Sequence, residues 1–227
     1  MQSDVTVEEP NNILMQKEKR SIGQITTGLR SVLSHPRVYD LFQNIMGAHL
    51  DRQYFSDAFV RAYPGCRVLD LGCGTAQILS YLPEGVDYWG YDINPKYIAA
   101  AHAKFAAKGQ FACRLPEESE MATMMPFDLV LASGVLHHLN DDTARNIFHL
   151  ARLALKQGGR FVSIDPILTP GQNPIARFLI NRDRGRYVRD KMGYLSLARY
   201  EFLRIEGTIR HRTWIPYAHW IMECTRT

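Results

Sequence analysis

The stretch Val68-Leu69-Asp70-Leu71-Gly72-Cys73-Gly74-Thr75-Ala76 decides the fold. A short apolar run ends in an acid, and two glycines separated by one residue follow it; Gln77–Leu82 then has the pattern of a helix. A strand, a tight glycine turn and a helix bring backbone N–H groups and a helix N-terminus to a polar ligand. Asp92 ends a second strand-like run, where an acid can bind both hydroxyls of a ribose. The sequence therefore predicts a site for an adenosine-containing cofactor.

The composition is that of a globular protein with a real core, because 46% of the 227 residues are apolar and 22% are charged. This length suits one large domain, or one domain with an appended cap. The net charge of +4, from 27 basic and 23 acidic residues, is small. A nucleic-acid-binding protein would carry a larger and clustered basic excess, so nucleic acid is not the expected partner.

The cysteines and the N-terminus indicate a compartment. The four cysteines are scattered and form no Cys-x-x-Cys pair; they are Cys66, Cys73, Cys113 and Cys224. This spacing argues against a bound metal and a disulfide framework, and it suits a reducing environment. Residues 1–20 lack the apolar core of a signal peptide, and no run reaches the ~18–20 apolar residues that cross a bilayer. The sequence predicts a cytoplasmic protein without a membrane span.

Three regions are expected along the chain. Residues 1–20 are polar and predict a flexible tail. Apolar residues at steps of three and four in 21–64 predict an N-terminal helical lid. Tyr63-Pro64-Gly65 ends this lid, and residues 65–227 form the main domain, which includes a helical insert at about 166–204.

Strand and helix patterns alternate in the main domain and predict an α/β fold with a doubly wound, seven-stranded, Rossmann-like sheet. The expected strands are 67–71, 86–91, 110–113, 127–132, 159–164, 206–214 and 217–224. The expected helices are 75–82, 95–108, 141–155, 174–180 and 195–202, with an acidic loop at 116–120 and a turn at 156–159. Ile215-Pro216 is too short for a crossover, so the last two strands should form an antiparallel hairpin.

The glycine motif is not that of a dinucleotide-binding protein, because Gln77 stands where that fingerprint requires its last glycine. The motif is followed, in order, by four further segments: Gly90-Tyr91-Asp92-Ile93-Asn94, Phe127–Ser133, Gly134-Val135-Leu136-His137-His138-Leu139 and Leu155–Gly159. Together the five segments resemble the class I S-adenosylmethionine-dependent methyltransferases, in the small-molecule branch of that family. The resemblance covers residues 65–165 in its motifs and 35–227 in architecture.

This resemblance implies a cofactor, S-adenosylmethionine, with S-adenosylhomocysteine as its product, and it assigns the residues that bind it. Asp70 would hold the methionine amino group, and Asp92 the ribose hydroxyls. The other implied cofactor-binding residues are Gly72, Cys73, Gly74, Ile93, Leu115, Ser133, Gly134 and His138.

Two positions depart from the family pattern. Ala76 stands where a third glycine is common, which the family tolerates. Arg114 follows the third strand where many members have an acid for the adenine amino group, and a guanidinium cannot accept a hydrogen bond. Adenine must then be bound by backbone groups, or by Glu117 or Glu118.

Two catalytic residues are predicted at the ends of strands. Methyl transfer is an in-line displacement that depends mainly on alignment, and it needs a base only when the acceptor arrives protonated. Imidazole groups titrate near neutrality, and His137 is the candidate base while His138 lies near the cofactor. Adjacent residues should point in different directions, so at most one faces the methyl group. Asp165 is a second candidate; the alternatives are packing or capping histidines and a turn-forming Asp-Pro.

The acceptor site should come from the lid and the insert. The candidate substrate residues are Tyr39, Arg182, Tyr187 and Arg189. Arginine forks suit phosphate or carboxylate, which makes an anionic small molecule one hypothesis, and a solvated face paired with Asp183 and Asp190 the other.

The function predicted from the sequence is S-adenosylmethionine-dependent methyl transfer to a small molecule, with the accepting atom and the oligomeric state left open. One alternative is methylation of RNA or another nucleic acid, although Ser133-Gly134-Val135-Leu136 lacks the Asn/Asp-Pro-Pro-Tyr motif of amino-methylating enzymes. The other alternative is a non-catalytic, cofactor-binding interaction protein.

Overall fold

The computed structural model describes residues 48–174, 177, 186–211 and 218–227. The strands are β1 (Arg67–Leu71), β2 (Asp87–Tyr91), β3 (Gly109–Ala112), β4 (Phe127–Ser133), β5 (Leu155–Pro166), β6 (Arg204–His211) and β7 (Ala218–Thr225). The α-helices are α4 (Ala48–Phe55), α5 (Pro95–Phe105), α6 (Glu118–Thr123), α7 (Asp141–Ala154) and α9 (Lys191–Ala198). Three short helical turns are η1 (Ser56–Val60), η2 (Gln77–Ser80) and η3 (Leu136–His138).

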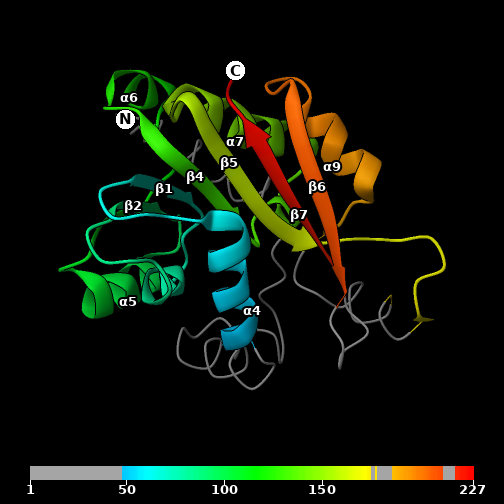
Figure 1. Cartoon of the computed structure of the whole chain (residues 1–227), viewed down its shortest axis with the longest axis horizontal. Helices are drawn as coiled ribbons and strands as arrows, with labels where there is room; N and C mark the ends of the chain where they lie inside the picture. Colours follow the sequence, from blue (N-terminus) through cyan, green and yellow to red (C-terminus); the bar gives the residue numbers. More distant parts are fainter. Residues whose placement is uncertain (1–47, 175–176, 178–185, 212–217) are drawn as a thin grey trace, which may run out of the picture.

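The seven strands form one sheet in the order β3-β2-β1-β4-β5-β7-β6. The first five strands are parallel, whereas β7 pairs antiparallel with both β5 and β6 (Figure 1). The prediction of a doubly wound sheet with a closing antiparallel hairpin is therefore confirmed. The order reverses between β1 and β4, and open α/β sheets bind ligands at the carboxyl ends of strands at such a point.

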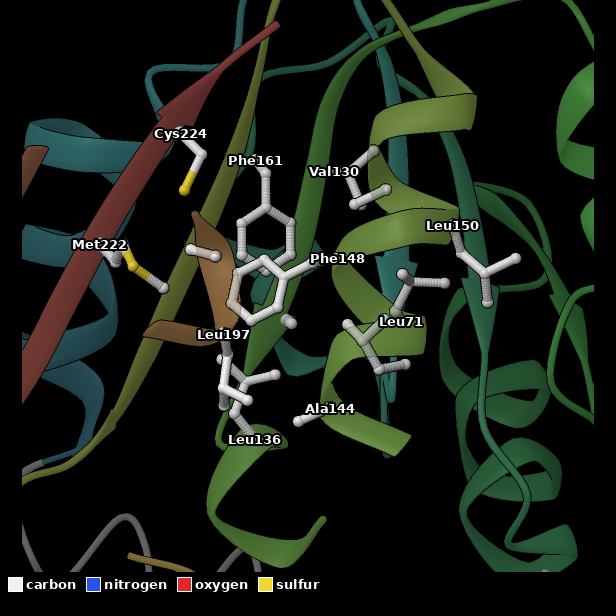
Figure 2. Close-up of a cluster of buried hydrophobic side chains, with 14 of the residues drawn as sticks. Leu71, Val130, Leu136, Ala144, Phe148, Leu150, Phe161, Leu197, Met222 and Cys224 are labelled. Carbon is white, nitrogen blue, oxygen red and sulfur yellow. The ribbon is translucent and has the colours of Figure 1, made fainter. Parts of the chain in front are cut away.

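Two apolar clusters cover the two faces of the sheet. Side chains of α6, α7 and α9 form one cluster, in which the Phe148 and Phe161 rings meet edge to face at 5.1 Å (Figure 2). Side chains of α4, η1 and α5 form the other, which includes Phe55 and Phe105. Helix α7 shows how the sequence specifies this packing: Asn140 caps its N-terminus, and its apolar residues recur on one face.

The described end of the N-terminal segment is attached to the sheet by Arg160 on β5. Its guanidinium donates to the carbonyl oxygens of Phe59 at 2.8 Å and Val60 at 2.6 Å, which satisfies carbonyls at the end of η1. Glu223 on β7 pairs with Arg160 at 2.8 Å and also with Arg61. Residues 21–47 of the expected lid and the insert helix expected at 174–180 lie wholly or largely outside the described residues.

Four expectations about the elements are wrong. The helix expected at 75–82 is only the short turn η2, because Ala76 has a left-handed φ of 53° and Pro83 follows closely. The acidic loop at 116–120 contains the start of α6. Strand β5 begins at Leu155, and the turn expected at 156–159 is a bulge where the register with β4 shifts. The helix expected at 195–202 is α9, which begins earlier, after the capping residue Asp190.

Candidate functional site

The glycine loop between β1 and η2 is fixed to the end of β2. The N–H groups of Gly72 and Cys73 both donate to the carbonyl oxygen of Tyr91, at 2.7 and 3.0 Å. Gly72 has a φ of 81°, and a Cβ there would lie 2.5 Å from Cγ2 of Val135, so a side chain would strain the backbone and displace a neighbour. At Gly74 a Cβ would meet no atom within 4 Å. The loop is therefore packed closely at Gly72 and open at Gly74.

Asp92 closes this loop at the end of β2. One carboxylate oxygen accepts from the N–H of Gly74 at 2.9 Å and the other from the N–H of Asn94 at 2.8 Å. Burial raises the pKa of Asp92, and these two N–H groups oppose that effect. The carboxylate is therefore held beside the open position at Gly74, where the further lone pairs of its oxygens suit a diol.

Asp70 lies at the carboxyl-terminal half of β1 and is 2% exposed. Its Oδ2 accepts from the Tyr88 hydroxyl at 2.6 Å, while Oδ1 has no hydrogen-bond partner among the described residues. Burial raises the pKa of Asp70 to about 7, and the Tyr88 hydrogen bond opposes this shift. A buried oxygen without a donor is costly, so this site suits a ligand that brings an N–H donor.

The residues beyond β2 and β3 form an apolar margin next to Asp92. Ile93 is 42% exposed, and the Cys113 thiol contacts the carbonyl oxygen of Ile93 at 3.8 Å. Arg114 turns away to Glu120, which it binds with both terminal nitrogens at 2.7 and 2.9 Å. Glu118 pairs with His149 on α7 at 3.2 Å.

A buried histidine–aspartate pair lies where β4 and β5 end. Nδ1 of His137 is 2.8 Å from Oδ1 of Asp165, and the backbone N–H of His137 donates to the same oxygen at 3.2 Å. Both side chains are buried, His137 on η3 and Asp165 on β5. Burial raises the pKa of Asp165, against the opposing effect of the His137 hydrogen bond. This contact fixes the ring and, with the proton on Nδ1, leaves Nε2 as the basic nitrogen.

Three residues predicted from the sequence as site residues lie beside this pair, namely Gly134, His138 and Tyr187. A Cβ at Gly134 would lie 3.8 Å from Cε1 of His137, and the N–H of Gly134 donates to the carbonyl oxygen of Ile164 at 2.8 Å. The expectation that the two histidines point apart is wrong, because the centroids of their rings are 4.0 Å apart. The N–H of Tyr187 donates to the carbonyl oxygen of His137 at 3.0 Å, which brings the insert beside the pair.

Arg189 was expected to bind the methyl acceptor, but its guanidinium is bound to other groups of the protein. All five N–H donors of its guanidinium are used within the protein, two by Asp141 and three by the carbonyl oxygens of Leu136, Leu139 and Tyr187. The side chain is 10% exposed. Arg189 therefore holds the turn that carries His137 and has no donor left for a ligand. Tyr39 and Arg182 lie outside the described residues.

The structure adds one residue that sequence reasoning missed. Tyr88 has the pattern of a core residue in a strand, and only the register reveals its partner. Gly90 is the Cα partner of Asp70, and Tyr88, two residues earlier, lies on the same face of the sheet.

Among the described residues there is no cluster of three or more potential metal ligands, and none of the described helices is long and apolar enough to cross a bilayer.

Residues 69–161, which carry the glycine loop, Asp92 and the His137 turn, match the sequence model of a family described as a methyltransferase domain. This stretch is a methyltransferase domain. The chain has the fold of the class I methyltransferases. No curated protein matches the chain. S-adenosylmethionine, the cofactor expected from the sequence, fits this site at Asp70, whose unpartnered oxygen suits an ammonium group, and at the loop of Gly74.

Solved structures with a similar fold include three described as methyltransferases. A TehB-like enzyme from Corynebacterium glutamicum is 20% identical, with a TM-score of 0.57 over 86% of this chain and 99% of that one. The apo form of SibL is 17% identical, with a TM-score of 0.64 over 96% and 70%. Phosphoethanolamine N-methyltransferase 2 from Haemonchus contortus, bound to S-adenosyl-L-methionine, is 16% identical, with a TM-score of 0.58 over 78% and 52%. At these identities the likeness concerns the fold.

Proposed function

We propose that this methyltransferase acts on a small molecule whose accepting atom carries a proton, and that His137 removes that proton. The observation that supports this is the buried contact of His137 with Asp165, 2.8 Å long, at the ends of two adjacent parallel strands. A histidine that only filled space would not need a buried carboxylate to fix its tautomer. Protonated acceptors include hydroxyl groups and ammonium groups, and the choice between oxygen and nitrogen stays open.

The site residues have two proposed roles, alignment of the cofactor and removal of a proton. When bound, S-adenosylmethionine would supply a methyl group on a positively charged sulfur, which is already a good leaving group. Asp70, Gly72, Cys73, Gly74, Asp92, Ile93, Leu115, Ser133, Gly134 and His138 are the residues proposed to align it. Nε2 of His137 takes the proton of the acceptor, and Asp165 stabilises the imidazolium that results. Positioning can contribute about 7–11 kcal/mol, and a base typically another 10²–10⁴-fold in rate.

The acceptor is proposed to lie beside Tyr187, whose N–H reaches the carbonyl oxygen of His137. The hypothesis of an anionic acceptor now depends on Arg182, which is not among the described residues, because Arg189 has no free donor. A cytoplasmic location also remains part of the proposal. The free state of all four cysteines is consistent with a reducing compartment.

Calorimetry tests the cofactor site. S-adenosylhomocysteine should bind the wild-type protein, and Asp92→Ala should weaken binding by about 100-fold, because it removes hydrogen bonds to a charged group. Asp87→Ala is the matched control, since Asp87 begins the same strand and pairs with Arg67 at 2.7 Å. Equal binding by wild type and Asp92→Ala would contradict the assignment of Asp92.

A panel of hydroxyl- and amine-bearing small molecules, with labelled S-adenosylmethionine, tests the chemistry. His137→Ala should lower kcat by about 10²–10³-fold on any acceptor found and leave the affinity for S-adenosylhomocysteine unchanged. His149→Ala, on the outer side of α7, is the control and should retain its kcat. Equal kcat values for His137→Ala and wild type would exclude His137 as the base. Tight, salt-sensitive RNA binding would favour a nucleic-acid substrate, and cofactor binding without product a non-catalytic role.

A further inference from the structure

Asp70 is the most deeply buried acid of the cofactor site, and its only described hydrogen bond comes from Tyr88. Both side chains are almost completely inaccessible, with exposures of 2% for Asp70 and 1% for Tyr88. The distance from the hydroxyl to Oδ2 is 2.6 Å, which is typical of a hydroxyl that donates to an ionised carboxylate. One oxygen is thus held while the other, Oδ1, has no partner among the described residues.

The charged groups around Asp70 do not otherwise favour its ionised form. Burial raises the pKa of Asp70, and repulsion from Asp92, at the end of β2, raises it further. Cys73, in the loop, has a thiol whose pKa is raised by burial and by the charge of Asp70. On the other neighbouring strand, β4, the register partner of Asp70 is the apolar Leu131. Of the described groups that affect the pKa of Asp70, only the Tyr88 hydroxyl lowers it and so favours the ionised carboxylate.

We propose that Tyr88 is a positioning residue for cofactor binding: its hydroxyl fixes Oδ2 of Asp70, so that the carboxyl ionises more readily and Oδ1 is free to accept the cofactor's ammonium group. This inference rests on the cofactor site assigned above. Removing the hydroxyl would leave the shape of the ring and its packing against Phe111 in place. Without the hydroxyl, the Asp70 carboxyl could rotate and would be easier to protonate. A protonated carboxyl attracts an ammonium group more weakly than an ionised one.

The test is the pH dependence of S-adenosylhomocysteine affinity in Tyr88→Phe, measured by calorimetry from pH 6 to pH 9. The ligand's own amino group titrates identically with both proteins, so it cancels in the ratio of the two Kd values. A charged hydrogen bond corresponds to a pKa shift of about one unit or more, so the variant should bind about tenfold more weakly at pH 6. The ratio should fall steadily towards its limiting value as the pH rises to 9, where Asp70 is ionised in both proteins.

Tyr63→Phe is the matched control, because it also removes a tyrosine hydroxyl that binds an aspartate, Asp128, at 2.7 Å. Its Kd ratio to wild type should stay near one at every pH. A Tyr88→Phe ratio that does not change with pH would overturn the proposal, because lost packing or stability alone weakens binding without following the ionisation of Asp70. Asp70→Asn should abolish the pH dependence that distinguishes wild type from Tyr88→Phe.

The number of protons released on binding provides a second measurement, which reports the ionisation of Asp70 before binding. Calorimetry at pH 7 in two buffers of different ionisation enthalpy should detect a fraction of a proton released on binding, since Asp70 loses its proton to accept the ammonium. A proton release from Tyr88→Phe no larger than that from wild type would also overturn the proposal, because less Asp70 should be ionised in the variant before binding. Failure of wild type to bind S-adenosylhomocysteine would instead contradict the cofactor site itself, so the two failures are distinguishable.

Discussion

The aspartates at the two ends of the parallel strands have opposite environments. At the carboxyl ends, Asp70 and Asp165 are buried, each keeps one oxygen without a described partner, and burial raises the pKa of both. At the amino end of β4, Asp128 has three donors: the Tyr63 hydroxyl, the N–H of Arg67 and the ammonium of Lys156. Although partial burial acts to raise it, these contacts together lower the pKa of Asp128.

This difference distinguishes a structural carboxylate, Asp128, from the two carboxylates with proposed functional roles, Asp70 and Asp165. Asp128 is satisfied within the fold, because its contacts join residues that flank the starts of β1, β4 and β5. Asp70 and Asp165 are incompletely satisfied, which costs stability and is retained where a ligand or a proton can complete the set. The carboxyl groups with raised pKa values therefore lie at the positions proposed for cofactor binding and for the base, on one edge of the sheet.

The largest expected effect comes from Asp70→Asn. The folded protein holds the Asp70 proton with a pKa of about 7, against about 4 in the unfolded chain, so the wild type loses stability as the pH rises through this window. The asparagine variant does not titrate. Its free energy of unfolding in urea, relative to wild type, should rise by about 4 kcal/mol between pH 4 and pH 8. A difference in unfolding free energy between variant and wild type that does not vary with pH would show that Asp70 lacks the raised pKa on which the comparison with Asp128 depends.

A smaller effect is expected for Arg189→Lys, which tests whether a fully paired charge near the active edge is structural. Lysine cannot reproduce the guanidinium fork that binds three carbonyl groups and Asp141. The free energy of unfolding should fall by about 2–3 kcal/mol in urea titrations at pH 7. If Arg189 bound the acceptor instead, the variant would raise KM and leave the unfolding free energy unchanged. Arg199→Lys, on the same insert, serves as the control.

The smallest effect is expected for Asp128→Asn. The pKa of Asp128 is lower in the folded protein than in the unfolded chain, where it is about 4. Asp128 therefore stabilises the fold at pH values above the unfolded pKa, and this contribution is lost as the pH falls through the folded pKa. The variant should lose about 1–2 kcal/mol at pH 7 and keep the wild-type Kd for S-adenosylhomocysteine. A loss of cofactor affinity would show that the two ends of the strands are not independent.

The elements with a strong periodic pattern were predictable from the sequence, and so was the edge of the sheet that carries the site. β1, β4 and α7 agree closely with the apolar patterns that specify them. The short turn η2 was not predictable, because the left-handed conformation of Ala76 depends on the loop that it closes. The role of Arg189 could not be inferred either, since nothing local shows that carbonyl groups distant in sequence need its donors.

The pairing of Tyr88 with Asp70 shows the same limit. A tyrosine in a strand predicts burial, while its hydrogen-bond partner depends on which strand lies beside it and in which register. His137 and Asp165 were both predicted as catalytic candidates, but the bond between them required β4 and β5 to be neighbours. Their catalytic roles stay predictions until the proposed variants are measured.

The position of β7 has a consequence for the order of folding. This strand follows β6 in the chain, yet it lies inside the sheet between β5 and β6 (Figure 1). Until residues 218–225 have been synthesised, β5 has no neighbour on one side, and the segment around Phe161 and Val162 exposes unpaired backbone. Such an edge can pair with another chain, so the nascent protein passes through an aggregation-prone stage that ends only when β7 inserts.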